Sequence, residues 1–246
     1  MFDIFRKKVK LQSVLYGMTD IHNHILPGID DGAKTIEESI DLVKDYIGMG
    51  ITKFYVTPHT MSDYYPNTKD TIHKSFEQLS KALIERGMDG QVDIKVASEY
   101  MLDYDFESLL EKNELLTMNQ NYVLIEMSCL HKFDRLNEVI YEMQNKGYKP
   151  ILAHPERYLY YVKDKNIFKE LKQRGIALQL NALSLTDHYG SHIKEKASEL
   201  LKEGSYDFIG LDTHKKGHIN LLSQAKVSAN FEKPIQQLVQ NNLKLF

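Results

Sequence analysis

The stretch Asp20-Ile21-His22-Asn23-His24 follows a short apolar run and precedes the turn Pro27-Gly28. It has the pattern Asp-x-His-x-His. In an extended strand, side chains two residues apart point to the same face. We therefore expect His22 and His24 to point together and to share one metal ion, with Asp20 on the same face to orient a ligand from behind. Taken alone, the pattern also fits a polar strand end whose histidines bond to the backbone.

The length and composition of the chain indicate one globular domain. Its 246 residues are enough to bury one sizeable core. Hydrophobic residues make up 42% and charged residues 26% of the chain, which is typical of globular proteins. The net charge of −3 gives no reason to expect nucleic acid or a membrane as the main partner. We interpret residues 18–246 as one domain and residues 1–17 as an N-terminal extension that packs on it or frays.

The single cysteine and the lack of a long apolar run indicate in which cellular compartment the protein works. Cys129 is the only cysteine in the sequence, so no disulfide can form within the chain, which fits a reducing compartment. No run of about 18 apolar residues occurs. Residues 1–10 lack the apolar core of a signal peptide, although they could form a small basic amphipathic helix that touches a membrane or partner. We therefore expect a cytoplasmic protein.

Short apolar or β-branched runs alternate with helical patterns along the chain. Thr35 and Glu38 predict a capping box for a helix that stops near Gly50, and a second apolar helix face around Val139 is closed by Gly147. Seven runs are expected to be strands: the run before the first histidine pair, and residues 52–57, 92–97, 122–125, 151–153, 176–180 and 207–211. This alternation favours parallel strands with crossover helices. The predicted fold is α/β, a distorted TIM-like (β/α)7 barrel, and an open doubly wound sheet is the alternative.

Residues able to bind metal ions stand where these runs end. They are His22, His24, His59, Glu99, Glu126, His154, Asp212 and His214, and Asp31 lies in the loop after the first run. In a barrel the carboxyl ends of the strands meet on one face, so these side chains would line one pocket. Buried carboxylates and imidazoles are costly without partners, which favours bound cations. A donor set of imidazole and carboxylate suits Mn²⁺, Fe or Zn²⁺ better than a cysteine-rich structural zinc site does.

Six segments together resemble a known family: Asp20–Gly32, Thr57–His59, Ser98–Tyr100, Leu124–Ser128, Ala153–Arg157 and Leu211–His214. In this order the chain resembles the polymerase and histidinol phosphatase (PHP) superfamily of metal-dependent phosphoesterases. It is most similar to the bacterial branch of protein-tyrosine phosphatases associated with capsule and exopolysaccharide synthesis. The resemblance covers about residues 18–214 and implies a distorted barrel of the PHP type.

The resemblance also implies a centre of three divalent metal ions, with manganese favoured and iron or zinc as alternatives. Three ligand groups would hold them: His22, His24, Glu99 and Asp212 for the first ion; Glu99, Glu126 and His154 for the second; Asp31, His59 and His214 for the third. Glu99 would bridge the first two ions. All nine positions carry a residue of the expected type.

The same resemblance implies roles in substrate binding. Arg157 would clamp the phosphate and, with Asp20 behind the ligands, contribute to catalysis. The family pattern has a second arginine after the last Asp-x-His, where this chain has Lys215 and Lys216, and a lysine supplies charge without the two-pronged geometry of arginine. We predict Lys216 at that contact, with Lys215 as the alternative. Tyr65, in the loop after the second strand, is expected either to hold a phosphotyrosine ring or to pack the loop.

The expected reaction is hydrolysis of phosphotyrosine in a protein. Clustered divalent cations neutralise phosphate charge and lower the pKa of bound water, and a phenolate leaving group needs little help from a general acid. The resemblance implies that the substrate is the tyrosine-rich tail of a bacterial tyrosine kinase controlling polysaccharide export, so membrane contact would be indirect, through the kinase. Two alternatives are a histidinol-phosphate or other small-molecule phosphatase and a non-catalytic barrel that binds a partner or glycan.

A second phosphatase signature is present but weak. Cys129 and Arg135 have the spacing Cys-x5-Arg of cysteine-dependent tyrosine phosphatases. That chemistry needs a thiolate in a tight loop of backbone N–H groups, usually with glycines. The five residues between them contain no glycine, and Asp134 would repel a phosphate. We therefore interpret Cys129 as a small packed residue.

Overall fold

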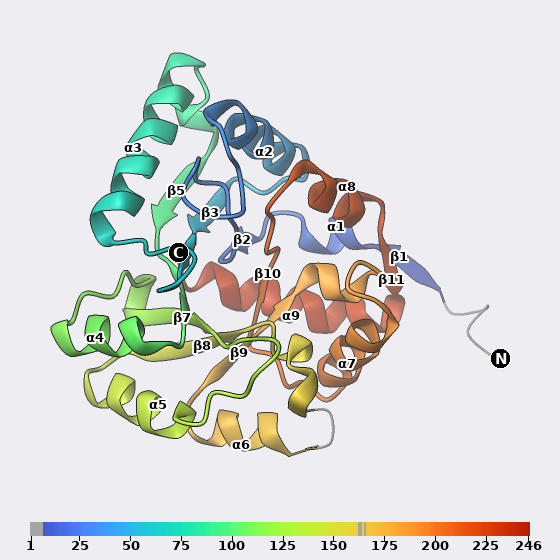
Figure 1. The fold of residues 1–246 in the computed structure, drawn as a ribbon. Helices are drawn as coiled ribbons and strands as arrows, with labels where there is room; N and C mark the ends of the chain where they lie inside the picture. Colours follow the sequence, from blue (N-terminus) through green and yellow to red (C-terminus); the bar gives the residue numbers. More distant parts are fainter. Residues whose placement is uncertain (1–6, 162–163, 165) are drawn as a thin grey trace.

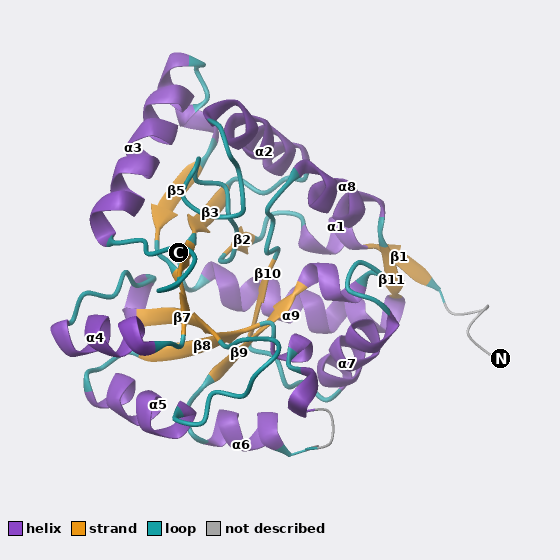
Figure 2. Ribbon diagram, in the orientation of Figure 1, coloured by secondary structure: helices purple, strands orange, loops and turns teal. Residues whose placement is uncertain are grey.

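Parallel strands surrounded by helices form the body of the protein in the computed structural model, which describes residues 7–161, 164 and 166–246 (Figures 1 and 2). One sheet contains β2 (Thr19–Asp20), β3 (Lys53–Val56) and β5 (Asp93–Val96), in that order. A second sheet has the order β10-β9-β8-β7-β6-β4, from β10 (Phe208–Gly210), β9 (Ala177–Asn181), β8 (Lys149–Ala153), β7 (Tyr122–Glu126), β6 (Glu99–Met101) and β4 (His59–Thr60). All pairs in both sheets are parallel.

The two sheets continue into one another and make a distorted barrel. β4 follows β3 after Pro58, and β6 follows β5 after Ser98, so the same two stretches of chain pair in both sheets. Proline has no N–H to give to a ladder, which explains the break. On the other side, a single bridge joins Asn23 to Thr213, where the His24 N–H donates to the Thr213 carbonyl at 3.0 Å. The barrel-like prediction is confirmed, with a seam of one bridge in place of a ladder.

All seven predicted strands are present, but with different limits. The first is only two residues long, so His22 and His24 lie just beyond it. The predicted strands 52–57 and 92–97 each stop one residue short at either end and then resume as β4 and β6, which were not predicted.

Helices cover the outside of the barrel (Figure 2). The α-helices are α1 (Leu11–Leu15), α2 (Ile36–Gly48), α3 (Lys69–Glu85), α4 (Tyr104–Lys112), α5 (Leu136–Asn145), α6 (Ile167–Gln173), α7 (Ser191–Lys202), α8 (Lys216–Gln224) and α9 (Glu232–Leu243). Short 3-10 turns are η1 (Asp89–Gln91), η2 (Asn119–Asn121), η3 (Pro155–Arg157), η4 (Leu159–Tyr161), η5 (Ala182–Leu185) and η6 (Ala229–Phe231). None of the described helices has the length and apolar character needed to cross a membrane.

Helix ends follow the predicted signals with one correction. Thr35 caps α2, accepting a hydrogen bond from the Glu38 N–H at 3.2 Å. The Glu38 carboxylate, however, accepts from the Lys34 N–H at 2.7 Å, so the predicted reciprocal bond of a capping box is displaced by one residue. Gly50 and Gly147 follow α2 and α5 with φ of 80° and 83°, a left-handed conformation that glycine adopts without strain.

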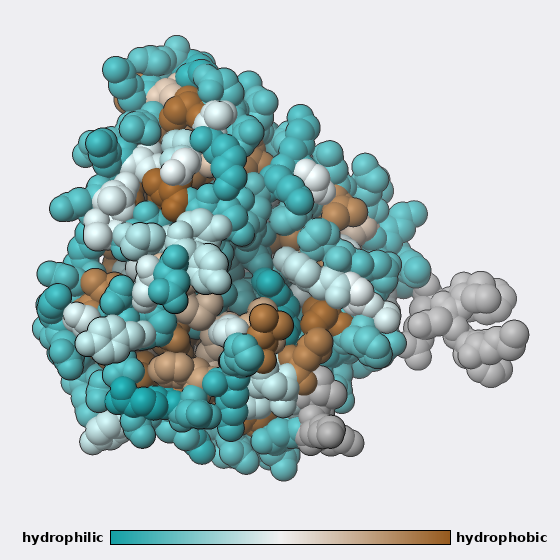
Figure 3. Space-filling model, viewed as in Figure 1, coloured by the Kyte–Doolittle hydropathy of each residue, from teal (hydrophilic) through white to brown (hydrophobic). Residues whose placement is uncertain are grey.

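Two apolar layers hold the barrel together. An inner cluster fills the barrel and includes Ile21, Tyr55, Leu124, Ile151 and Leu245. A larger outer cluster lies between the strands and the helices. Removing this apolar surface from water is the main stabilising contribution, at about 25 cal/mol per Å². Most of the visible face is hydrophilic, and hydrophobic side chains appear on it as separate patches (Figure 3).

The segment before the barrel is tied to it by a small ribbon. β1 (Lys8–Lys10) pairs antiparallel with β11 (Lys226–Ser228), and Leu11 and Leu15 of α1 are fully buried. Residues 1–6 lie outside the described part of the chain, so the amphipathic helix considered for residues 1–10 is only partly within it. The boundary at residue 17 stays a prediction.

Candidate metal centre

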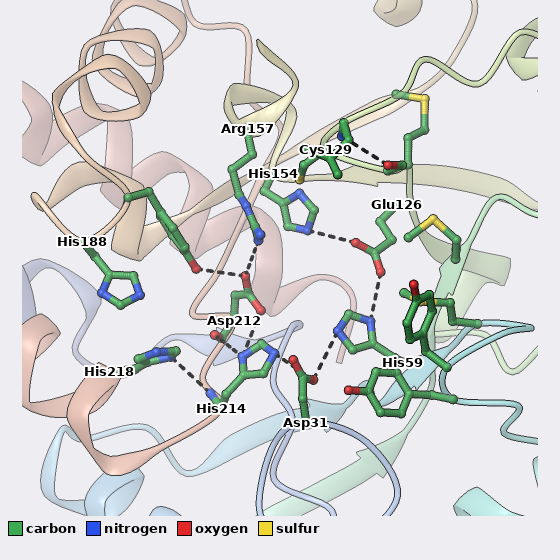
Figure 4. A pocket seen from close by; sticks show the side chains of 18 of the residues that line it. Asp31, His59, Glu126, Cys129, His154, Arg157, His188, Asp212, His214 and His218 are labelled. Carbon is green, nitrogen blue, oxygen red and sulfur yellow. Dashed lines mark hydrogen bonds and ion pairs between the residues drawn. The ribbon is translucent and has the colours of Figure 1, made fainter. Parts of the chain in front are cut away.

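The nine predicted ligands lie together at one end of the barrel, and six of them border one cavity (Figure 4). Four groups have ligand atoms within 4.8 Å of one another: His24, Asp31, His59 and His214; His22, His24 and Asp212; His22, Glu99 and His154; His59, Glu99 and Glu126. The groups share members, so they form one continuous cluster. Parallel strands that end at the same edge bring residues from positions 22 to 214 into this space.

Glu99 is at the centre of the cluster. Its Oε2 lies 3.1 Å from His22 Nε2 and 3.0 Å from His59 Nδ1, and its Oε1 lies 3.2 Å from His154 Nε2. Asp212 Oδ1 lies 3.4 Å from Nε2 of His22. A carboxylate surrounded by three imidazoles is suited to take part in holding a divalent cation.

Several of these buried atoms have no hydrogen-bond partner within the described residues. They are Nε2 of His22, Nε2 of His24, Nδ1 of His59, Oε2 of Glu99 and Oε1 of Glu126. Buried polar atoms are rarely left unpaired, because desolvation without a partner is costly. Because all five belong to the ligand set and lie in one cluster, the residues fit a group of divalent cations. Imidazole and carboxylate donors without thiolate agree with that fit.

The charges of the cluster are strongly coupled. Burial by itself lowers the pKa of His22, but the Glu99 and Asp212 carboxylates outweigh burial and raise it to about 9. Burial by itself raises the pKa of the Asp212 carboxyl. The nearby His22, His24, His214 and Arg157 outweigh burial and hold this pKa well below its usual range. The carboxylates are therefore ionised and attract positive charge, whether from protonated imidazoles or from metal ions.

Two residues that the sequence did not single out orient the first histidine pair. The Gln179 side-chain oxygen accepts a hydrogen bond from His22 Nδ1 at 2.9 Å, and Asp30 Oδ2 accepts from His24 Nδ1 at 2.7 Å. Each bond leaves Nε2 as the atom that faces the cluster. Asp30 could have been found from the sequence, because it stands beside the predicted ligand Asp31 in the same loop. No sequence pattern marks Gln179, which lies in β9.

Asp20 lies at the barrel seam, next to the predicted ligand His22. Its buried carboxylate accepts from the Tyr46 hydroxyl at 2.8 Å, from Asn23 Nδ2 at 3.0 Å and from the Leu211 N–H at 2.9 Å. It also lies 3.3 Å from the His22 N–H. Asp20 thus fixes the backbone on both sides of the barrel seam, and it contacts the predicted ligand His22 through the backbone N–H and not through the ring.

Arg157 lies beside the cluster. It is the last residue of η3, the turn that directly follows the predicted ligand His154. Its Nη1 donates to Asp212 Oδ2 at 3.2 Å, and its guanidinium stands 4.8 Å from the centre of the Tyr189 ring. With 28% of its side chain exposed, it borders a cavity of about 610 Å³ that contains the cluster. The guanidinium can therefore meet an anion that enters this cavity.

Two ligands stand on strained backbone. His154 has φ of 35° and Asp212 has φ of 50°, a left-handed conformation that is uncommon for residues other than glycine. Such strain costs on the order of 1–3 kcal/mol per residue and is found mainly at functional sites. His154 comes immediately after β8, and Asp212 comes two residues after the end of β10.

Of the predicted substrate contacts Tyr65 and Lys216, only Tyr65 borders the cavity. Tyr65 borders the cavity and stacks on His59, with ring centres 5.7 Å apart and 11° between the planes. Lys216 does not border this cavity: it begins α8, is exposed, and its Nζ lies 4.0 Å from Asp45. The alternative residue at this contact, Lys215, borders the cavity.

The cysteine signature does not form a site. The Arg135 guanidinium pairs with Glu107 at 2.6 Å and with Glu138 at 2.8 Å, so it is engaged away from Cys129. Burial raises the pKa of the Cys129 thiol above its ordinary value, which disfavours the reactive thiolate. The interpretation of Cys129 as a packed residue agrees with this geometry.

The fold and site together define a class of protein. A distorted α/β barrel that gathers imidazoles and carboxylates at the carboxyl ends of its strands is typical of metal-dependent hydrolases of the PHP superfamily. Residues 18–229 match the family model described as "Capsular polysaccharide synthesis, CpsB/CapC", and the chain belongs to this family.

Comparisons with individual proteins agree with this membership. The chain is 31% identical over 198 residues to the tyrosine-protein phosphatase YwqE of Bacillus subtilis strain 168, covering 80% of this chain and 77% of that one. A crystal structure from work on YwqE and on CpsB of Streptococcus pneumoniae, described as metal-dependent tyrosine phosphatases, superposes with a TM-score of 0.80, 27% identity and coverage of 93% and 94%. A histidinol phosphate phosphatase of Lactococcus lactis shares the fold, with a TM-score of 0.55, 16% identity and coverage of 92% and 93%.

Proposed function

We propose that this protein is a metal-dependent phosphatase that hydrolyses phosphotyrosine in proteins. The observation that carries the proposal is the cluster of nine imidazole and carboxylate ligands next to Arg157, in a family whose relatives include tyrosine-protein phosphatases. A barrel kept only to bind a partner would be expected to have lost some of these ligands, and all nine are present.

The ligands divide most naturally among three divalent ions, for which manganese is the favoured metal and iron or zinc are alternatives. The proposed groups are His22, His24, Glu99 and Asp212; Glu99, Glu126 and His154; Asp31, His59 and His214. His59 lies between the last two groups, because its Nε2 is 3.5 Å from Asp31 and its Nδ1 is 3.0 Å from Glu126. When bound, divalent cations supply positive charge for phosphate oxygens and activate water as a nucleophile.

The protein's own residues bind and orient the ester. Arg157 is held by Asp212 and presents its remaining N–H groups to the cavity, in a planar geometry suited to two phosphate oxygens. Lys215 adds a second positive charge at the cavity wall. Tyr65 would contact the phenyl ring of the substrate. A phenolate, with a pKa near 10, leaves without strong protonation, so an aryl phosphate needs little help from a general acid.

The proposed substrate protein is a bacterial tyrosine kinase of capsule or exopolysaccharide synthesis, and the proposed compartment is the cytoplasm. Family membership in capsular polysaccharide synthesis supports this choice. The enzymatic alternative is a phosphatase for a small metabolite such as histidinol phosphate, which shares the fold.

A substrate comparison on the metal-loaded protein tests the proposal. We expect a phosphotyrosine peptide to be hydrolysed with a much higher kcat/KM than histidinol phosphate, and the activity to vanish with a chelator and return with Mn²⁺. A preference for histidinol phosphate would contradict the substrate assignment. Full activity in excess chelator, or purified protein without stoichiometric transition metal after Mn²⁺ loading, would contradict the metal assignment.

A further inference from the structure

The cavity above the metal centre has an apolar side that the proposed chemistry does not use. Four side chains, here called the apolar rim, come from β6 and from the loops after β4 and β7: Met61, Tyr64, Met101 and Leu130. Leu130 is 82% exposed and Tyr64 is 74% exposed. Single exposed apolar side chains are ordinary, but several that border one cavity indicate a contact surface.

Other residues give the cavity a different chemistry. Arg157, His188 and Lys215 also border it, from the segments after β8, β9 and β10. Figure 4 shows His188 to the left of Asp212, Arg157 above it and Glu126 to the right. A phosphate ester that enters this cavity therefore meets the positive charges of Arg157 and Lys215 as well as the apolar side chains of the rim.

The apolar rim also borders a neighbouring cavity. A second, smaller cavity of about 210 Å³ shares Met61 with the main one and is bordered by Pro66, Tyr100, Phe106 and Leu109 among others. The main cavity, at about 610 Å³, falls in the size range of sites that bury a drug-sized ligand. Together the two cavities offer more apolar contact than a small polar metabolite phosphate can use.

We propose that the apolar rim is a subsite for an apolar or aromatic side chain next to the phosphotyrosine of a peptide substrate. This proposal rests on the proposed function and specifies its substrate class. A phosphotyrosine whose phosphate reaches the ligand cluster leaves its backbone at the mouth of the cavity, so the neighbouring residue meets the apolar rim. Two of the four rim residues are methionines, which are flexible and polarizable, so the subsite accepts several apolar residues and not one fixed sequence.

The test uses two phosphotyrosine peptides that are identical except for the residues flanking the phosphotyrosine, which are leucine in one and serine in the other. For the wild-type protein loaded with Mn²⁺, we expect kcat/KM to be about tenfold higher for the leucine peptide, mainly through KM, because a flanking side chain is removed from water. Equal kcat/KM for the two peptides would overturn the proposal.

Variants of a rim residue test whether the apolar rim causes the preference for the leucine peptide. Leu130→Asp is expected to bring the ratio of the two kcat/KM values close to one, and Leu130→Met to restore it. The mutated side chain is mostly exposed, so the substitution leaves the fold intact. Ile84→Asp, which replaces a 63% exposed aliphatic residue on α3, is the matched control and should keep the wild-type ratio. A wild-type ratio in Leu130→Asp would overturn the assignment to the rim.

The outcomes separate this inference from the proposed function. Hydrolysis of free phosphotyrosine reports whether the metal centre works without any flanking residue. If free phosphotyrosine and both peptides are hydrolysed equally well, the subsite is refuted and the phosphatase stands. If none of them is hydrolysed while histidinol phosphate is, both proposals fail.

Discussion

The floor and the rim of one cavity differ in almost every physical respect. The floor consists of imidazoles and carboxylates, most of them buried and placed at or next to the ends of barrel strands. The rim is apolar, partly exposed and carried mostly by the segments that follow those strands. Rigid strands hold groups that must meet within a few tenths of an ångström, whereas loops can vary without disturbing them. The floor is therefore expected to determine whether an ester is hydrolysed, and the rim which ester.

The largest effect is expected when a predicted metal ligand is removed from the floor of the cavity. Asp212→Ala takes away an oxygen that lies 3.4 Å from Nε2 of both His22 and His24, and it frees Arg157 from its partner. We expect kcat/KM for every substrate to fall on the order of a thousandfold or more, with bound metal reduced, while circular dichroism shows a folded protein. Asp41→Ala, at an exposed position of α2, is the control and should keep full activity. Near-wild-type activity in Asp212→Ala would refute the metal assignment.

A smaller effect is expected from the residues behind the floor. Gln179→Ala removes the acceptor that orients His22, and such changes typically reduce metal affinity or activity by about 10- to 100-fold. Titration of activity with Mn²⁺ should show a higher metal requirement, with activity recovering at high Mn²⁺. Gln179→Glu keeps an acceptor oxygen and should lie closer to the wild type. An unchanged Mn²⁺ requirement in Gln179→Ala would show that His22 is oriented without this bond.

Glycine at position 210 gives a steric test of the same region. A Cβ there would lie 2.6 Å from the Cβ of His22 and 2.7 Å from Nε2 of Gln179. Gly210→Ala is therefore expected to destabilise the protein by about 1–3 kcal/mol and to displace His22, so that both the midpoint of thermal unfolding and the activity fall. Gly90→Ala is the matched control, because no atom lies within 4 Å of a Cβ at that position. Equal unfolding midpoints for the two variants would contradict the close packing at Gly210.

The smallest effect is expected at Cys129, which borders the cavity but belongs to neither the ligand set nor the apolar rim. Burial raises the pKa of its thiol, so the thiolate fraction near pH 7 is lower than for a free cysteine. Cys129→Ser should leave kcat/KM within about twofold, and the wild-type thiol should react slowly with iodoacetamide at neutral pH. Loss of turnover in Cys129→Ser would revive a cysteine-dependent mechanism.

The sequence predicts the floor because of a simple regularity. Ligand residues such as His59 and His154 directly follow apolar runs, and the ends of parallel strands converge whatever their separation in sequence. Gln179 was missed because its role depends on a contact with a residue 157 positions away, which no local pattern reveals. Lys216 was chosen over Lys215 because the start of α8, and hence which lysine faces the cavity, depends on packing.

The fold was predictable at the level of strands and helices, and less so at the seams. β4 and β6 have two and three residues, too few for an alternation of apolar and polar residues to be recognised. The seam between Asn23 and Thr213 depends on the buried carboxylate of Asp20, which bonds to groups from both sides. The apolar rim was also beyond prediction, because Met61, Met101 and Leu130 come together only through the barrel.

The left-handed backbone at His154 and Asp212 limits how this protein can be made more heat-resistant. Glycine would relieve the torsional penalty at either position, but it would also remove the donor atom. Thermostabilising substitutions must therefore be sought elsewhere in the molecule, and a selection for heat resistance alone would tend to favour inactive sequences at these two sites.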